Sequence, residues 1–167
     1  MADRQRIDDL RRRVEQDPTS IAFAQLAEEL RRAGDLEQAI NVSRAALKVH
    51  PDYISARITL GRALLETNQL DSARAEFQYV RAKAPDNVAA LRGLANIAEQ
   101  RGHIDDSVAL YRTAIRLAPK DPELPRIVAR LSETARVREA ASERERAERT
   151  IAALEQFSAA IRNQKAH

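Results

Sequence analysis

ISARITLGRALLETNQLDSARAEFQYVRAKAPDN, residues 54–87, is the stretch of sequence that decides the fold. Leu60 and Leu64 lie four positions apart, and Ala73, Phe77 and Val80 follow spacings of four and then three. Each set forms the apolar stripe of one amphipathic helix. The polar break at residues 68–69 contains no apolar run long enough for a strand. The stretch therefore predicts a helix, a tight turn and a second helix folded back on the first.

The same unit occurs three times at a fixed step of 34 residues, without an insertion. A boundary proline, a leucine, a small residue and a turn residue all recur: Pro51, Pro85 and Pro119; Leu26, Leu60 and Leu94; Ala27, Gly61 and Ala95; Gly34, Asn68 and Gly102. The small residue allows two helices to approach closely. The turn residue tolerates a positive φ, which suits a helix C-terminus. The repeat predicts a row of helix hairpins.

These residues resemble the tetratricopeptide repeat (TPR), in which an apolar residue, Leu-Gly, an aromatic, Ala, another aromatic and Pro recur at the same step. The matching residues are Phe23, Leu26, Ala27, Leu30, Gly34, Ala39, Ala46 and Pro51 in the first unit, Leu60, Gly61, Leu64, Ala73, Phe77 and Pro85 in the second, and Leu91, Leu94, Ala95, Gly102, Tyr111, Ala114 and Pro119 in the third. Arg57 replaces a large apolar residue and Ser43 an aromatic, so we expect looser packing around both. The resemblance covers residues 18–135 and implies an all-α fold, a right-handed α-solenoid of TPR helix hairpins with a concave groove.

The chain is expected to divide into consecutive helical segments: an N-terminal capping helix at 1–17, repeats at 18–53, 54–87 and 88–121, a solvating first helix of a fourth unit at 122–135, and a charged helical tail with an apolar end at 136–167. In the first of these, Ile7, Leu10 and Val14 share one face. We interpret this helix as a cap over the exposed end of the first repeat, because terminal repeats need such covers. The alternative is a basic arm for an acidic partner or a membrane surface, which its own acidic residues argue against.

The tail contains neither Gly nor Pro, and its first half alternates acidic and basic residues, as a solvated helix does. Apolar residues then return at a spacing near 3.5: Ile151, Leu154, Phe157 and Ile161. This stripe is about two heptads long, which is short for a coiled coil. It can fold back onto its own array, pair with a second copy in a homodimer, or dock onto a different protein. We adopt self-association as the hypothesis and leave the other two open.

Composition narrows the function. A net charge of +3, interleaved acids and bases, and 4% aromatic residues are not typical of a nucleic-acid-binding surface. The absence of cysteine excludes disulfides and thiolate metal sites. No apolar run approaches the length of a membrane span, and no signal-peptide core follows the charged N-terminus. We therefore expect no membrane insertion and a cytoplasmic protein. The excess of arginine over lysine indicates a bacterial composition.

Catalysis is not expected. The three histidines, His50, His103 and His167, are scattered along the predicted superhelix, which argues against a shared metal or a His-based triad. The glycines follow the repeat and form no phosphate-binding loop. We expect neither a cofactor nor a metal.

The concave groove is the predicted binding site, because in TPR-like arrays the first helix of each unit lines it. The groove residues chosen by register are Tyr53, Ile58, Arg62, Leu65, Arg92, Asn96, Arg126 and Arg130. Arginine presents a rigid fork that suits carboxylates and phosphates. We therefore expect the groove to bind an acidic or carboxylate-bearing segment of a partner protein, with the amide of Asn96 on the peptide backbone. In the alternative interpretation, the arginines pair with local acids: Glu66, Glu99, Glu123 and Glu133.

One subclass of TPR proteins is argued against. Co-chaperones that hold the C-terminal carboxylate of heat-shock proteins use Lys, Asn and Arg at set first-helix positions, and the corresponding residues here are Ala24, Glu28, Thr59, Ala89 and Gly93. The sequence therefore predicts a non-catalytic scaffold without that clamp. A structural homo-oligomerisation module acting through the C-terminal helix is the alternative function.

Overall fold

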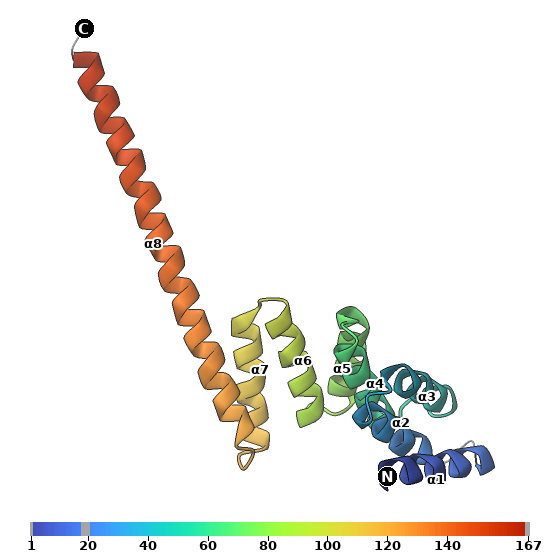
Figure 1. Cartoon of the computed structure of the whole chain (residues 1–167). Helices are drawn as coiled ribbons and strands as arrows, with labels where there is room; N and C mark the ends of the chain where they lie inside the picture. The colour runs from blue at the N-terminus through green and yellow to red at the C-terminus, as the bar shows by residue number, and fades with distance from the viewer. Residues whose placement is uncertain (1, 18–20, 166–167) are drawn as a thin grey trace.

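The computed structural model describes residues 2–17 and 21–165, with side-chain surroundings for residues 4–17 and 21–158. In this part of the chain every element is a helix: α1 (Ala2–Gln16), α2 (Ala22–Arg32), α3 (Leu36–Val49), α4 (Ile54–Glu66), α5 (Leu70–Lys83), α6 (Val88–Gln100), α7 (Ile104–Leu117) and α8 (Glu123–Lys165). Helices α2 to α7 form three successive hairpins that stack side by side, and α8 leaves the last hairpin as a long helix (Figure 1). The all-α solenoid with a long C-terminal helix is confirmed.

The hairpin turns share one geometry. Gly34, Asn68 and Gly102 have φ of 84°, 58° and 79°. The residue after each turn residue donates its N–H to a carbonyl five positions earlier: Asp35 to Leu30 at 2.9 Å, Gln69 to Leu64 at 2.8 Å, His103 to Ala98 at 2.9 Å. This is the hydrogen bond that ends a helix with a left-handed residue. The repeated turn residue in the sequence therefore has a direct backbone cause.

Phe77 is the central packing residue of the stack. Its side chain is 0% exposed and lies between α4 and α6, against Gly61 and Gly93. A Cβ atom added to Gly93 would lie 2.4 Å from the ring, and one added to Gly61 would lie 2.8 Å from it. The close approach of these two helices therefore depends on the absence of both side chains.

Looser packing was expected at Ser43, where a serine replaces the aromatic residue of the repeat. Ser43 is 0% exposed. By the repeat register, the positions that hold Gly61 and Gly93 around Phe77 hold Ala27 and Thr59 around Ser43. By register, these larger residues offset part of the volume that the serine lacks. The remaining cost is polar, since the Ser43 Oγ has no hydrogen-bond partner among the described residues.

The second expected weak point, Arg57, is also well packed. Its guanidinium lies 3.6 Å from the centroid of the Tyr79 ring. It donates to Glu76 Oε2 at 2.7 Å and to the carbonyl oxygen of Pro51 at 2.7 and 2.9 Å. An aromatic face and two acceptors take the place of the missing apolar residue, because the arginine stem covers apolar surface while its head is paired.

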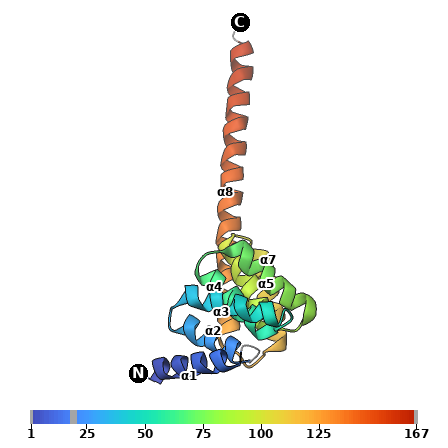
Figure 2. The ribbon, with the colours of Figure 1, turned by 90° about the vertical axis from the view of Figure 1, so that its right-hand side faces the viewer.

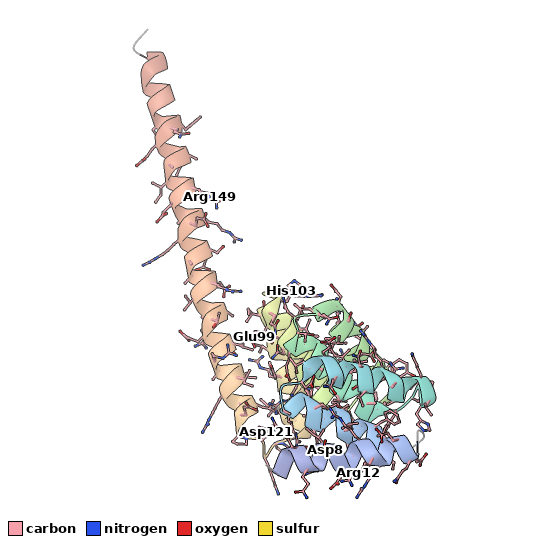
Figure 3. All side chains as sticks on the ribbon, turned by 45° about the vertical axis from the view of Figure 1, so that its right-hand side comes forward. Asp8, Arg12, Glu99, His103, Asp121 and Arg149 are labelled. Atoms are coloured by element: carbon pink, nitrogen blue, oxygen red, sulfur yellow. The ribbon has the colours of Figure 1, made fainter. Side chains whose placement is uncertain are left out.

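The two terminal helices end the stack differently. Ile7 and Leu10 of α1 are buried against the core that includes α2, while Asp8 and Arg12 point outward (Figure 3). Helix α8 buries Leu124 and Leu131 against α7, and the described side chains from residue 136 onward are exposed. In Figure 2 this part of α8 extends well beyond the stack. Helix α8 packs on α7 and forms ion pairs with α6 through Glu123 and Arg130. Its described side chains from residue 136 to residue 158 are exposed, so this part of the tail does not fold back into the groove.

Candidate functional site: the concave groove

A cavity of about 690 Å³ lies between the first helices of successive hairpins. It is lined by residues of α2, α4, α6 and the start of α8, with two residues from second helices at its floor: Glu28, Arg31, Arg32, Arg62, Leu65, Phe77, Val88, Ala89, Arg92, Gly93, Asn96, Tyr111, Glu123 and Ile127. Because first helices lie next to one another in the stack, their equivalent positions form rows along the groove. The cavity therefore combines an apolar floor with charged sides.

The structure brings together half of the predicted groove residues. Arg62, Leu65, Arg92 and Asn96 all line this cavity. Tyr53 and Ile58 line a second cavity of about 520 Å³ near α2 and α4, which Arg62 also borders. The Tyr53 hydroxyl donates to the carbonyl oxygen of Ile21 at 3.5 Å, and Ile58 is 8% exposed, which leaves it little surface for a ligand.

The two predicted residues on α8 lie outside both cavities. Arg126 is exposed and makes no ion pair with a described residue. Arg130 donates to Glu99 Oε1 at 2.8 Å, and this hydrogen bond raises the pKa of the Arg130 guanidinium. In Figure 3, Asp121 lies where α8 begins and Glu99 lies on the side of the stack next to α8. The first turns of α8 thus close one end of the groove.

Most of the groove arginines are paired within the chain. Arg92 donates to Asp121 at 2.8 Å and also to Glu123. The alternative interpretation named Glu123 and Glu99, and both form ion pairs with predicted groove arginines, Glu123 with Arg92 and Glu99 with Arg130. Glu66 instead pairs with Arg31, and Glu133 lies 3.9 Å from Arg136. Ion pairs between neighbouring units therefore neutralise Arg31, Arg92 and Arg130, whereas Glu133 and Arg136 lie on the same helix.

Glu28 is the centre of the charge network at the α2 end. It accepts from Arg31 at 2.8 and 3.0 Å, from Arg32 at 3.2 Å and from the Thr59 hydroxyl at 3.3 Å. Burial by itself raises the pKa of Glu28, but the hydrogen bond and charge of Arg31, together with Arg62 and Arg32, hold that pKa below its usual value. Its carboxylate is therefore ionised and shared among several cations.

Arg62 has the weakest internal pairing of the cavity arginines that form ion pairs. Its closest carboxylate oxygen is that of Glu28, at 3.7 Å. Burial lowers the pKa of Arg62; Glu28 opposes that shift, and the neighbouring cations Arg31, Arg92 and Arg32 add to it. A half-buried cation with one long contact, surrounded by like charges, gains most from an added anion. Arg62 is thus the point where the groove is electrostatically incomplete.

Sequence reasoning missed part of the lining. Tyr111 occupies the same repeat position as Phe77 and was assigned to helix packing, yet it lines the cavity floor; burial raises its pKa. Val88 opens α6, and Ile127 lies on α8. Ile127 lies three positions after Leu124 and four before Leu131, so the helical spacing of these apolar residues was the available signal for it. No sequence signal could have identified Tyr111 as a lining residue, because the same side chain also packs between helices.

Other kinds of site find no support in the described part of the chain. No group of three His, Cys, Asp or Glu side chains there can hold a metal ion. Within the same residues, none of the helices is both long and apolar enough to cross a membrane.

Comparison with known proteins agrees with this geometry. Two family models described as tetratricopeptide repeat match residues 58–122 and residues 30–78. Together they extend over more than half of the chain. The chain belongs to the tetratricopeptide repeat family. Its TPR architecture is that of a scaffold for protein–protein interaction.

Solved TPR structures share the fold. MamA 41-end from Desulfovibrio magneticus RS-1 superposes with a TM-score of 0.69 at 20% identity, over 82% of this chain and 78% of that one. A thermophilic TPR protein of Thermus thermophilus gives 0.66 at 25% identity, over 75% and 70%. The first TPR of Spaghetti (RPAP3), bound to the HSP90 peptide SRMEEVD, gives 0.66 at 11% identity, over 71% and 94%.

Curated relatives match over a short region. Protein CTR9 homolog of Arabidopsis thaliana is 33% identical over 94 residues, which is 54% of this chain and 9% of the relative. Cellulose synthase operon protein C of Pseudomonas fluorescens is 34% identical over 79 residues, 47% of this chain and 6% of the relative. The chain thus spans less than a tenth of the length of either relative.

Proposed function

We propose that this TPR protein is a non-catalytic scaffold whose concave groove binds an acidic or carboxylate-bearing segment of a partner protein. The observation that carries the proposal is the state of Arg62: half-buried, 3.7 Å from its closest carboxylate and surrounded by other arginines. A ligand carboxylate at this point relieves cation–cation repulsion and adds a charge-assisted hydrogen bond. Leu65 and Val88, which line the same cavity and are partly exposed, favour an apolar side chain next to the carboxylate.

A TPR of the same fold supports the ligand class. The first TPR of Spaghetti (RPAP3) holds a peptide, SRMEEVD, with three acidic residues. The present chain would use different contacts, because Ala24, Glu28, Thr59, Ala89 and Gly93 stand at the positions of the co-chaperone clamp. We propose that Arg62 and Arg92 bind the carboxylate and that the Asn96 amide contacts the backbone of the segment. Arg92 must then share its fork with Asp121 and Glu123.

The test is a peptide array that samples acidic, neutral and basic segments, probed with the wild-type chain, Arg62→Glu and Arg126→Glu. The two variants carry the same charge change, and Arg126 borders neither cavity. We expect the wild type and Arg126→Glu to select carboxylate-bearing peptides, and Arg62→Glu to lose them with an unchanged helical spectrum. Selection of neutral peptides, or equal selection by both variants, would rule the groove proposal out.

A second candidate function is homo-oligomerisation through α8. The observation in its favour is the exposure of Ile151, Leu154 and Phe157, at 56%, 60% and 66%, on the part of α8 that has left the stack. The side chain of Ile161 lies outside the described residues. Large apolar side chains in one row on a single helix need a cover. Light scattering on the full chain and on a version ending at Arg136 tests this: a dimer that becomes a monomer on truncation supports it, and a monomer in both forms eliminates it.

A further inference from the structure

Helix α8 carries two apolar rows on different sides. The first row packs on α7 and includes Leu124 and Leu131. The second begins at Val137, which is 60% exposed, and follows a heptad: Val137, Ala140, Arg144, Ala147, Ile151 and Leu154. With 3.6 residues per turn, the six positions from Leu131 to Val137 place the second row about 120° around the helix from the first. The second row is therefore no continuation of the packing on α7.

We propose that the α8 tails of two copies form an antiparallel two-stranded coiled coil through this second row, centred between residues 145 and 146. The proposal rests on the second candidate function and names its partner, seam and orientation. A row with alternate spacings of three and four is the pattern of a coiled-coil seam. It extends the stripe of Ile151 and Leu154 backward by two heptads and makes Phe157 a flanking residue rather than a core one.

Side-chain volumes fit the antiparallel arrangement. Val137 then faces Leu154 of the second copy, Ala140 faces Ile151, and Arg144 faces Ala147. In the Ala140–Ile151 pair and in the Arg144–Ala147 pair, a small residue faces a large one. Beside Ala147 there is room for the arginine stem, and its head reaches Glu148 of the second copy, which flanks the same layer. The single charged seam position is thereby accommodated.

Charges decide against the parallel arrangement. In parallel, in-register helices, Arg144 faces its own copy across the seam, and Glu143 flanks the seam opposite Glu148. Both contacts join like charges. In the antiparallel register the flanking pairs are Arg136 with Phe157, Glu143 with Thr150 and Ala141 with Glu148. None of these repels, and the first places a guanidinium beside an aromatic ring.

The neighbouring antiparallel register is also disfavoured. A shift by one heptad toward the C-terminus sets Glu148 opposite Glu148 and faces Arg144 with the large Leu154. The favoured register holds the two TPR stacks at opposite ends of the coil. At 1.5 Å per residue, the Leu131 positions of the two copies lie roughly 40 Å apart along the axis. Each end of the coil then carries one groove, so one dimer can join two partner segments.

Cysteine cross-linking tests the proposal, because the natural chain contains no cysteine. Val137→Cys and Leu154→Cys change exposed residues away from the stack, so both variants keep its fold. A disulfide forms only between residues whose Cα atoms lie within about 7 Å. Under mild oxidation we expect a covalent dimer when the two variants are mixed, at least tenfold above the amount in either variant alone. Ser142→Cys, which faces away from the seam, is the matched control and should not cross-link to Leu154→Cys.

The outcomes separate the orientation from the oligomer. Light scattering that shows a dimer, with each variant cross-linking to itself, overturns the antiparallel coil and leaves homo-oligomerisation standing. A monomer across a wide concentration range, with no mixed cross-link, overturns the coil and the second candidate function together. Peptide selection by the groove requires no second copy, so it is measured independently of both.

Discussion

Gly93→Ala is the substitution whose cost the structure defines most closely. The added methyl carbon would lie 2.4, 2.5 and 2.6 Å from three atoms of the Phe77 ring. The ring cannot retreat, because its opposite edge already meets Gly61, where a Cβ would lie at 2.8 Å. Overpacking of this kind costs about 1–3 kcal/mol. We place this case at the upper end, because both helices that hold the ring would have to move.

Helix propensity opposes part of that cost. Alanine is better than glycine in a helix interior by about 1 kcal/mol. The expected net loss in free energy of unfolding is therefore about 2 kcal/mol, equivalent to a fall in Tm of roughly 4–8 °C for a chain of this size. Circular dichroism at 222 nm, followed with temperature and with urea, measures both quantities. The whole cost arises in one contact, between α6 and the Phe77 ring.

A double-mutant cycle isolates that contact. Phe77→Leu shortens the side chain and opens space next to Gly93. In that background Gly93→Ala should be nearly neutral or stabilising, with a coupling energy of about 1–2 kcal/mol. If Gly93→Ala leaves the stability of the wild-type chain unchanged, or if its cost is equal in both backgrounds, the packing argument is refuted.

Three further predictions concern the turns, the departures from the repeat and the groove. Gly34→Ala should destabilise by about 1 kcal/mol in thermal unfolding, because its φ of 84° strains any residue with a Cβ although no atom lies within 4 Å; an unchanged Tm would contradict this cause. Arg57→Ala should cost about 1–2 kcal/mol in urea titration through the lost stacking on Tyr79 and the lost pair with Glu76. A change below about 0.5 kcal/mol would show that solvent replaces both contacts. The folded-state pKa of Glu28 is lowered, so its contribution to stability is complete above the unfolded-state pKa of about 4.3 and is lost as pH falls through the lower folded-state value. Glu28→Gln should therefore flatten the decline of Tm with acid, and an identical acid profile would exclude this role.

The fold could be predicted because each repeat position has one local cause. Gly34, Asn68 and Gly102 recur because the backbone at these turns takes a positive φ. The boundary prolines and leucines recur because every hairpin meets an equivalent neighbour. A period of this kind expresses nearest-neighbour packing, and nearest-neighbour packing is what defines a solenoid.

The groove could be predicted in part. Register placed Arg62, Arg92 and Asn96 on one face, and they line one cavity. Register could not show which arginines were already paired. Asp121 holds Arg92 from the connection before α8, 29 positions away in the chain, and no period relates the two. The incomplete pairing of Arg62 therefore became visible in the structure alone.

The surroundings of Ser43 and Arg57 could not be predicted, for a related reason. Ser43 and Arg57 each break the repeat pattern, and a single position read alone suggests a gap. In the stack, Ala27 and Thr59 are larger at the positions around Ser43, and Tyr79 covers Arg57. Residues in neighbouring repeats compensate for each other, so different repeat positions depend on one another. A comparison of the same position in successive repeats does not reveal this dependence.

The central claim, that the groove is electrostatically incomplete at Arg62, is tested most directly by calorimetry. The titration uses the acidic peptide that the array selects, against the wild-type chain, Arg62→Glu and Arg126→Glu. A hydrogen bond to a charged group is worth about 1.5–3 kcal/mol, or roughly 10–100-fold in Kd. We predict a loss of at least tenfold for Arg62→Glu and less than threefold for Arg126→Glu, at equal ionic strength. Equal affinity of the three proteins for the peptide would contradict the claim.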